Sequence, residues 1–251
     1  MNSLTDLTGT PALVTGASRG FGRAAATALC EAGAQVVGIA RGQDELEKVR
    51  AELGDAFTPI AADAADPIVA ERLIRAHRPR ILVLNAGVVP VARPIHEHTW
   101  ETFSRHWEVD VQHVFHWTRL AISLPLDPGS VVVAVSSGAA LGGSPVSGGY
   151  AGAKATIRFL TSYAAEESER GGLGITFLSV LPGMTPGTGI GNAGIVGYAA
   201  RQGVEVETYL QGLSATLSPD EVGRTIVDLA RSPVHESRSY RLAPGGPFPL
   251  D

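Results

Sequence analysis

The sequence predicts a doubly wound α/β domain, in which about seven mostly parallel strands form one sheet with helices on both faces. Short apolar runs alternate with longer helical patterns, and this order is typical of right-handed strand–helix–strand crossovers. The run 131–135 is apolar throughout, as expected of a parallel strand buried on both faces. We find no linker-like change of composition and no internal repeat of about 20–50 residues, so residues 1–251 are expected to form one domain.

The individual elements follow from the length and periodicity of the apolar runs. The short runs predict strands at 12–15, 35–40, 57–61, 81–84, 131–136, 175–180 and 239–243. The longer patterns predict helices at 20–32, 43–53, 68–77, 99–122, 150–169 and 219–231. Asp66 and Ser218 are the expected N-caps of two helices, because each precedes a proline suited to the first helical position.

One long segment, 183–217, departs from this alternation. It begins rich in glycine, and a short helix is expected near 204–213. Loops of this length inside compact domains are commonly functional lids. We therefore predict a substrate-loop insertion, with Ile190, Ile195, Val196 and Tyr198 forming an apolar lining.

Composition excludes several classes of protein. The formal net charge is −5 and no basic block is present, which argues against a nucleic-acid partner. The uncharged stretches are too rich in glycine and polar residues to cross a membrane, and no apolar leader precedes the first predicted strand. Cys30 is the single cysteine, which excludes an internal disulfide and suits a reducing compartment. We expect a cytoplasmic protein.

A glycine-rich loop follows the first predicted strand and opens the first predicted helix. Gly16 allows a sharp turn, and Gly20 and Gly22 let the helix begin close to a bound pyrophosphate. The negative charge of a pyrophosphate suits the free N–H groups of a helix N-terminus. This arrangement predicts a dinucleotide-binding, Rossmann-like site. Its loop contacts are expected from Gly16, Ser18, Arg19, Gly20, Phe21 and Gly22.

The same loop also fits the G-x-S-x-G pattern of a hydrolase nucleophile elbow, with Ser18 as the nucleophile. Such an elbow needs an oxyanion loop from an earlier strand, and Ser18 follows the first predicted strand. A serine hydrolase is kept as the alternative function from another class.

The end of the second predicted strand indicates which dinucleotide binds. An acidic residue there would hold the adenosine ribose hydroxyls, but the position is Ala40. Arg41 follows it and offers a planar, charged donor group to a 2′-phosphate, and Arg19 is placed to close on the same phosphate. The sequence therefore favours NADP(H) over NAD(H).

Tyr150 and Lys154 lie four residues apart in a predicted helix, on the same face. A phenol has a pKa near 10, and a nearby cation favours its ionised form. Tyr150 is thus a candidate general acid and base. Lys154 is one of only two lysines in the chain, so its position beside Tyr150 is notable.

Several motifs in order resemble those of the short-chain dehydrogenase/reductase family over nearly the whole chain. They are Thr15-Gly16-x3-Gly20-x-Gly22, Asp63, Asn85-Ala86-Gly87, Ser137, Tyr150-x3-Lys154 and Pro182-Gly183. The resemblance implies hydride transfer between NADP(H) and a carbonyl or secondary alcohol. Tyr150 would exchange the proton, Lys154 would lower the pKa of Tyr150 and hold the nicotinamide ribose, and Ser137 would bind the carbonyl.

The resemblance also implies further cofactor contacts. Asp63 would lie near the adenine, and Asn85, Ala86 and Gly87 would lie along the cofactor. The nicotinamide amide would be surrounded by Pro182, Gly183, Thr185 and Thr188. A dimer or tetramer of this chain is implied as well. Within the same fold, a non-redox or NADP(H)-sensing protein is the alternative.

One residue departs from the family pattern. The family usually has a fourth catalytic residue, an asparagine that holds a proton-relaying water, and its position here is Asp110. An aspartate brings a negative charge and no amide donor. Near Lys154 it would oppose formation of the tyrosinate. We expect Asp110→Asn to be active with a shifted pH–rate profile.

Other reactive side chains are interpreted more simply. Five histidines cluster between His96 and His116, but structural zinc sites want four ligands and no cysteine lies nearby, so no metal is expected. Cys30 lies in an apolar helix and is expected to be a small buried side chain rather than a nucleophile. Three tryptophans between Trp100 and Trp117 are interpreted as packing residues, in part at a subunit interface.

Overall fold

The computed structural model describes residues 6–213 and 215–250. The two ends of the predicted domain and Ser214, inside the predicted insertion, lie outside the described residues. Within these residues a single eight-stranded sheet has the order β3-β2-β1-β4-β5-β6-β7-β8. The chain order reverses between β1 and β4, so the loops after these two strands part and open a crevice at their carboxyl ends. The doubly wound α/β fold expected from the sequence is confirmed.

The predicted strands are found with small changes at their ends. Their bounds are β1 Pro11–Thr15, β2 Gln35–Ala40, β3 Phe57–Ala61, β4 Ile81–Leu84, β5 Val131–Val135, β6 Thr176–Pro182 and β7 Ser239–Ala243. These strands are parallel. The prediction of about seven strands missed β8, Gly246–Leu250, which pairs antiparallel with β7. Its two prolines hid it, since proline is accepted in a strand only at a sheet edge.

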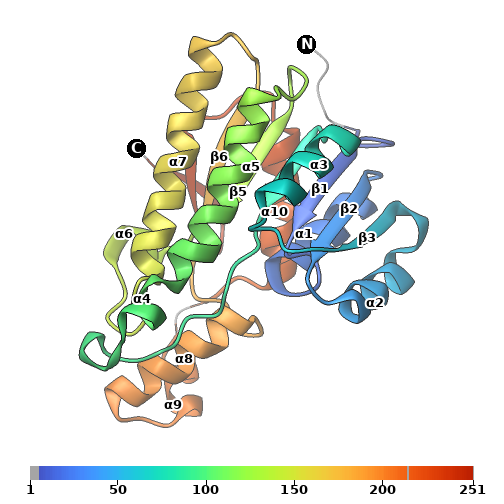
Figure 1. Ribbon diagram of the computed structural model, residues 1–251. Coiled ribbons are helices and arrows are strands. Elements are labelled where there is room, and N and C mark those ends of the chain that lie inside the picture. The colour runs from blue at the N-terminus through green and yellow to red at the C-terminus, as the bar shows by residue number, and fades with distance from the viewer. Residues whose placement is uncertain (1–5, 214, 251) are drawn as a thin grey trace.

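Helices cover both faces of the sheet (Figure 1). Their bounds are α1 Gly20–Glu31, α2 Gln43–Leu53, α3 Pro67–His77, α4 Trp100–His106, α5 Gln112–Ser123, α6 Ala139–Gly142, α7 Tyr150–Arg170, α8 Gly189–Gln202, α9 Val206–Gln211 and α10 Pro219–Arg231. One core joins the sheet to α1, α2 and α10, and a second joins it to α3, α5 and α7. The expected N-caps are present: the carboxylate of Asp66 accepts from the Ile68 N–H at 2.8 Å, and Ser218 forms a capping box with Glu221.

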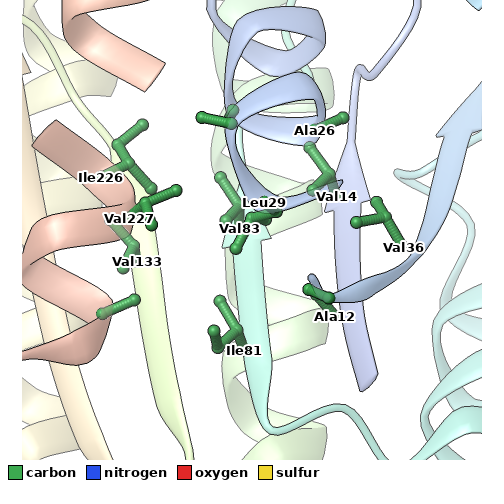
Figure 2. Packing of buried hydrophobic residues seen from close by; sticks show 14 of the residues in the cluster. Ala12, Val14, Ala26, Leu29, Val36, Ile81, Val83, Val133, Ile226 and Val227 are labelled. Carbon is green, nitrogen blue, oxygen red and sulfur yellow. The ribbon is translucent and has the colours of Figure 1, made fainter. Parts of the chain in front are cut away.

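The first core shows how alternating strand residues are used. Ala12 and Val14 of β1 face α1, whereas Leu13 between them faces the other core. In Figure 2, Leu29 of α1 lies beside Val83, and Ile226 and Val227 of α10 lie beside Val133. Gly223 lets α10 approach α1 closely, because a Cβ there would lie 2.5 Å from the Ala24 carbonyl oxygen.

Two predicted segments differ from the structure. The single helix predicted at 99–122 is α4 followed by a π-helical turn, Trp107–Val111, and then by α5. The segment 183–217, predicted as a loop with one helix near 204–213, contains both α8 and the shorter α9. Its glycines allow α8 to pack closely against the loop before it, since a Cβ at Gly191 would lie 1.9 Å from the Thr185 carbonyl oxygen. The short α6 was not predicted.

Candidate active site

A cavity of about 810 Å³ lies at the carboxyl ends of the central strands. It brings together residues from the loops after β1, β2, β3, β4, β5 and β6. Among the predicted cofactor residues, its lining includes Gly16, Ser18, Arg19, Gly20, Phe21, Arg41, Asp63, Asn85, Ala86, Gly87, Tyr150, Lys154, Pro182, Gly183, Thr185 and Thr188. Gly22 and Asp110 do not line the cavity and lie behind its wall.

The glycine loop has the shape that a pyrophosphate requires. Gly16 and Gly20 have φ values of +69° and +57°, a region that favours glycine. A Cβ at Gly22 would lie 2.2 Å from the Gly16 carbonyl oxygen, so only glycine fits there. No side chain caps the N-terminus of α1, which leaves its first N–H groups open to an anion. These residues fit a dinucleotide phosphate.

Asn85 holds the glycine loop against the end of β4. Its side-chain amide donates to the carbonyl oxygens of Thr15 and Gly16, at 3.2 and 3.3 Å. The Thr15 hydroxyl in turn accepts from the backbone N–H groups of Asn85 and Ala86. This exchange fixes the distance between the two loops on either side of the crevice.

Charged groups gather at the end of the cavity beyond β2. Arg19, Arg41 and Asp63 line it, together with Glu45 at the start of α2. The carboxylate of Asp63 accepts from the Ala65 N–H at 2.9 Å, which fixes its direction. Glu45 was not predicted as a site residue, because its position in the first turn of α2 gave only an ordinary helix-end signal.

Tyr150, Lys154 and Ser137 meet at the opposite end, near the carboxyl end of β5. Tyr150 and Lys154 are buried in the first turns of α7, with Lys154 Nζ 5.6 Å from the centroid of the Tyr150 ring. Lys154 Nζ also donates to the Val135 carbonyl oxygen at 3.2 Å. Ser136 donates its hydroxyl to the Lys154 carbonyl oxygen at 2.7 Å.

The ionisation of Tyr150 reflects opposing influences. Burial is the largest, and it raises the pKa of the phenol. The Lys154 ammonium and a hydrogen bond with Ser137 act to lower it, whereas the Asp110 carboxylate adds to the increase. The lowering expected from the cation alone is therefore outweighed, and the pKa of Tyr150 lies above its ordinary value.

Asp110 is fully buried on the π-helical turn. Its Oδ1 accepts from the Val88 N–H at 2.9 Å, and its Oδ2 lies 3.4 Å from Lys154 Nζ and 3.5 Å from His106 Nδ1. Burial opposes ionisation, but Lys154, His106 and the Val88 N–H together outweigh it, and the pKa of Asp110 is lowered. Asp110 is thus a buried carboxylate in contact with Lys154. As expected from the sequence, its negative charge opposes ionisation of the Tyr150 phenol.

His106 and His113 are site-associated residues that the sequence analysis set aside. Asp110 lies four residues after His106 and three residues before His113, a spacing that places all three on one helix face. This spacing can be read from the sequence and could have identified both histidines. His113 lines the cavity and is fully buried, and burial lowers the pKa of its imidazole to about 3. His113 is neutral at physiological pH.

A neutral buried histidine makes the fold sensitive to mild acid. Folding lowers the pKa of His113 from 6.5 to about 3, so below pH 6.5 the unfolded chain binds a proton that the folded chain does not. The free energy of unfolding therefore decreases as the pH is lowered. The free energy of unfolding is expected to drop by about 1.5 kcal/mol between about pH 6.5 and about pH 5. Urea titrations at both pH values should show this drop, and His113→Leu should remove it. An equal drop in the variant would contradict the assignment.

The substrate end of the cavity is only partly as predicted. Ile190 and Tyr198 line it, whereas Ile195 is buried and Val196 is exposed elsewhere on α8. A helix turns these neighbours to different sides, which the loop prediction could not anticipate. The lining not anticipated from sequence includes Leu141, Ser144, Met184 and Arg241. The Tyr198 hydroxyl donates to Ser144 Oγ at 2.9 Å, which links α8 to the loop after α6.

The tryptophans and Cys30, which were interpreted as packing residues, differ in how deeply they are buried. Trp117 is buried and its Nε1–H donates to the Ala64 carbonyl oxygen at 2.8 Å, whereas Trp100 and Trp107 are exposed. Cys30 is half-buried, and burial raises the pKa of its thiol to about 11. Among the described residues, no group of three or more histidine, cysteine, aspartate or glutamate side chains is arranged to hold a metal.

Two further structural findings concern the alternatives. In residues 6–213 and 215–250, Ser18 makes no side-chain hydrogen bond to a histidine or a carboxylate, as a triad nucleophile would. None of the helices in the described part of the chain is both long enough and apolar enough to cross a bilayer.

A family model described as short chain dehydrogenase matches residues 10–194, which is most of the chain. The chain belongs to this family. The match includes the glycine loop, Ser137, Tyr150 and Lys154, and it ends within α8. The resemblance inferred from the sequence motifs is thereby confirmed.

Individual relatives within the family share modest identity with this dehydrogenase. A probable NADP-dependent dehydrogenase of Haemophilus influenzae is 27% identical over 90% of this chain and 89% of its own. A D-erythrulose reductase of Gallus gallus is 34% identical, with the match covering 51% of this chain and 53% of that protein. A crystal structure of a 3-ketoacyl-(acyl-carrier-protein) reductase from Brucella melitensis complexed with NADH has a TM-score of 0.75 and 25% identity, covering 90% and 92% of the two chains. The printed names of these relatives share an oxidoreductase activity, and two of them name a nicotinamide cofactor. The chain is an NAD(P)-dependent oxidoreductase of this family.

Proposed function

We propose that this short-chain dehydrogenase is an NADP(H)-dependent carbonyl reductase or alcohol dehydrogenase acting on a small, largely apolar substrate. The observation that carries the proposal is the position of Ser137, Tyr150 and Lys154 on the same cavity as the open N-terminus of α1. One end of that cavity fits a phosphate, and the other holds a proton-exchanging group.

The roles of the residues follow from their chemistry. When bound, the dinucleotide supplies or accepts the hydride. In the direction of reduction, Ser137 binds the carbonyl oxygen through its hydroxyl, and Tyr150 gives the phenol proton to that oxygen. Lys154 provides the positive charge that stabilises the resulting phenolate and donates hydrogen bonds to ribose hydroxyls. Leu141, Met184 and Tyr198 line the substrate end and exclude water.

The other cofactor residues are assigned by position around the cavity. The phosphates would contact the loop residues Gly16, Ser18, Arg19, Gly20 and Phe21, and Gly22 would support the loop from behind. Asn85, Ala86 and Gly87 would lie along the cofactor. Asp63 would lie at the adenine, and Pro182, Gly183, Thr185 and Thr188 at the nicotinamide amide. Thr188 has a structural task as well, because its hydroxyl accepts from the Gly191 N–H at 2.9 Å and caps α8.

Preference for NADP(H) is supported by Arg19 and Arg41 at the adenosine end and by Ala40 in place of a carboxylate. Arg41→Ala should weaken NADPH binding by about ten- to hundredfold, since a charged hydrogen bond contributes about 1.5–3 kcal/mol. NADH binding should change little. Nicotinamide fluorescence titrations measure both, with Arg50→Ala on the exposed part of α2 as the control. Equal losses for NADPH and NADH in Arg41→Ala would overturn the preference.

The assembly and location are proposed on indirect grounds. Trp107 at the π-helical turn and Phe159 and Tyr163 on α7 are exposed aromatic residues, and the last two stack on each other. Such surfaces favour burial against a second copy, so we infer a homodimer or homotetramer. The single cysteine supports a cytoplasmic protein. A protein that binds NADP(H) without redox turnover is the second candidate, because Asp110 raises the pKa of Tyr150.

A further inference from the structure

A series of four buried ionisable side chains runs from the wall of the cavity into the protein behind it. It begins at Tyr150, continues through Lys154 and Asp110, and ends at His106. Each residue is less than a tenth exposed, and Asp110 is fully buried. The last member, His106, also packs edge-on against the Tyr150 ring, with 5.2 Å between ring centroids.

The two ring nitrogens of His106 differ in their surroundings. Nδ1 is sealed from solvent, has no full hydrogen bond, and faces Asp110 Oδ2 at 3.5 Å. Nε2 does not share this contact with Asp110, and the side chain as a whole is only 3% exposed. In His113, by contrast, both nitrogens are sealed, and burial lowers its pKa to about 3, so it is unsuited to carry a proton.

The charges of these four side chains explain how a histidine beside Asp110 affects Tyr150. With Asp110 ionised and Lys154 protonated, the pair has no net charge, so Asp110 offsets part of the attraction between Lys154 and the Tyr150 phenolate. A proton on His106 would balance Asp110 and return the net positive charge to the cluster. Asp110 lies on the same π-helical segment that follows His106, and Tyr150 and Lys154 face them both from α7.

We infer that His106 is a positioning residue that stores the proton with which Tyr150 is resupplied, acting through Asp110 and Lys154. This inference rests on the proposed reductase function. After Tyr150 has given its proton to the substrate oxygen, the net step is transfer from the His106 imidazolium to the Tyr150 phenolate. One imidazole N–H bond breaks, one phenol O–H bond forms, no electrons change hands, and neutral His106 then takes a proton from water.

The kinetic test compares His106→Gln with the wild type in steady-state turnover from about pH 5 to about pH 9, because Tyr150 must be resupplied with a proton between successive turnovers. Glutamine keeps a polar side chain of similar size but takes up no proton. We expect the rate to fall about tenfold or more, and the inflection in the range where imidazoles titrate to disappear. NADPH affinity should stay unchanged. His116→Gln, on α5 and away from this chain of residues, is the control and should leave the rate and its pH profile unchanged.

The double variant separates relay from packing. If His106 acts through Asp110, adding His106→Gln to Asp110→Asn should lower the rate no further than Asp110→Asn alone. Asp110→Asn itself should be active with a shifted pH–rate profile. Independent, additive losses, or a His106→Gln enzyme with the wild-type pH profile, would overturn the inference.

A second measurement does not depend on finding a substrate. Imidazole ¹⁵N spectra of the histidine-labelled full chain, assigned by the signal lost in His106→Gln, report the protonation of His106 directly. We expect the spectra to show the His106 imidazolium in the wild type and to show less of it in Asp110→Asn, since the carboxylate 3.5 Å from Nδ1 stabilises an imidazolium. A His106 that stays neutral throughout would overturn the inference. An enzyme without turnover would overturn the proposed function, while the spectra would still decide this point.

Discussion

Tyr150→Phe is expected to lower kcat by about a thousandfold, because it removes the proton that the substrate oxygen must receive. Tyr150 is buried at the start of α7 and lines the cavity beside Ser137. A phenylalanine ring fills the same space, so the packing against His106 and the bound dinucleotide should be preserved. The loss should therefore be confined to turnover.

The rate measurement on Tyr150→Phe needs two controls, one for NADPH binding and one for the stability of the fold. NADPH affinity, followed by nicotinamide fluorescence, should agree with the wild type within about twofold, and the melting temperature should change little, since the ring is retained. A variant that keeps more than about a tenth of the wild-type kcat would show that another group supplies the proton. Ser137, the other hydroxyl group of the proposed catalytic set that lines the cavity, would then be the next position to change.

Lys154→Met is expected to destabilise the fold by about 3–5 kcal/mol, in addition to abolishing turnover. Lys154 is the cation closest to the fully buried Asp110, at 3.4 Å, and removing it leaves that carboxylate without its ion pair. Methionine matches the length of the lysine stem, so the loss is electrostatic rather than a cavity. Urea unfolding of the full chain measures the difference.

Adding Asp110→Asn to Lys154→Met is the matched test of that cause. The double variant has no buried charge at this position, so it should recover most of the lost stability while remaining inactive. If the losses in the free energy of unfolding caused by Lys154→Met and Asp110→Asn add in the double variant, the two residues are not coupled. In that case the lowered pKa of Asp110 would rest on His106 and, after it, on the Val88 N–H.

The fold was predictable because local signals and topology agree. The parallel strands are read from apolar runs such as Val131–Val135, and the glycine loop from three glycines within seven residues at the junction between the first strand and the first helix. β8 was missed since Pro247 and Pro249 contradict strand propensity and are accepted only at the edge. α8 was missed since its glycines serve close packing, which is a tertiary property.

The candidate site was predictable where a residue type has one strong chemical use. Tyr150 and Lys154 are linked by helical spacing, and Arg41 follows a strand end that lacks a carboxylate. His106 was not found, because the role proposed for it depends on the π-helical turn that begins at Trp107 and on the burial of Asp110 beside it. Neither the extra residue in a helical turn nor the depth of a side chain is encoded in simple periodicity.

The most direct measurement is the oxidation of NADPH by the full-length chain against a panel of ketones and quinones, beside NADH and the Tyr150→Phe variant. The structure predicts turnover with at least one apolar ketone, a preference for NADPH, and loss of turnover in Tyr150→Phe with NADPH still bound. Turnover that prefers NADH, or that persists in Tyr150→Phe, would contradict the assigned cofactor or the assigned acid. NADPH binding without turnover on any substrate would instead favour a sensing role built on the same fold.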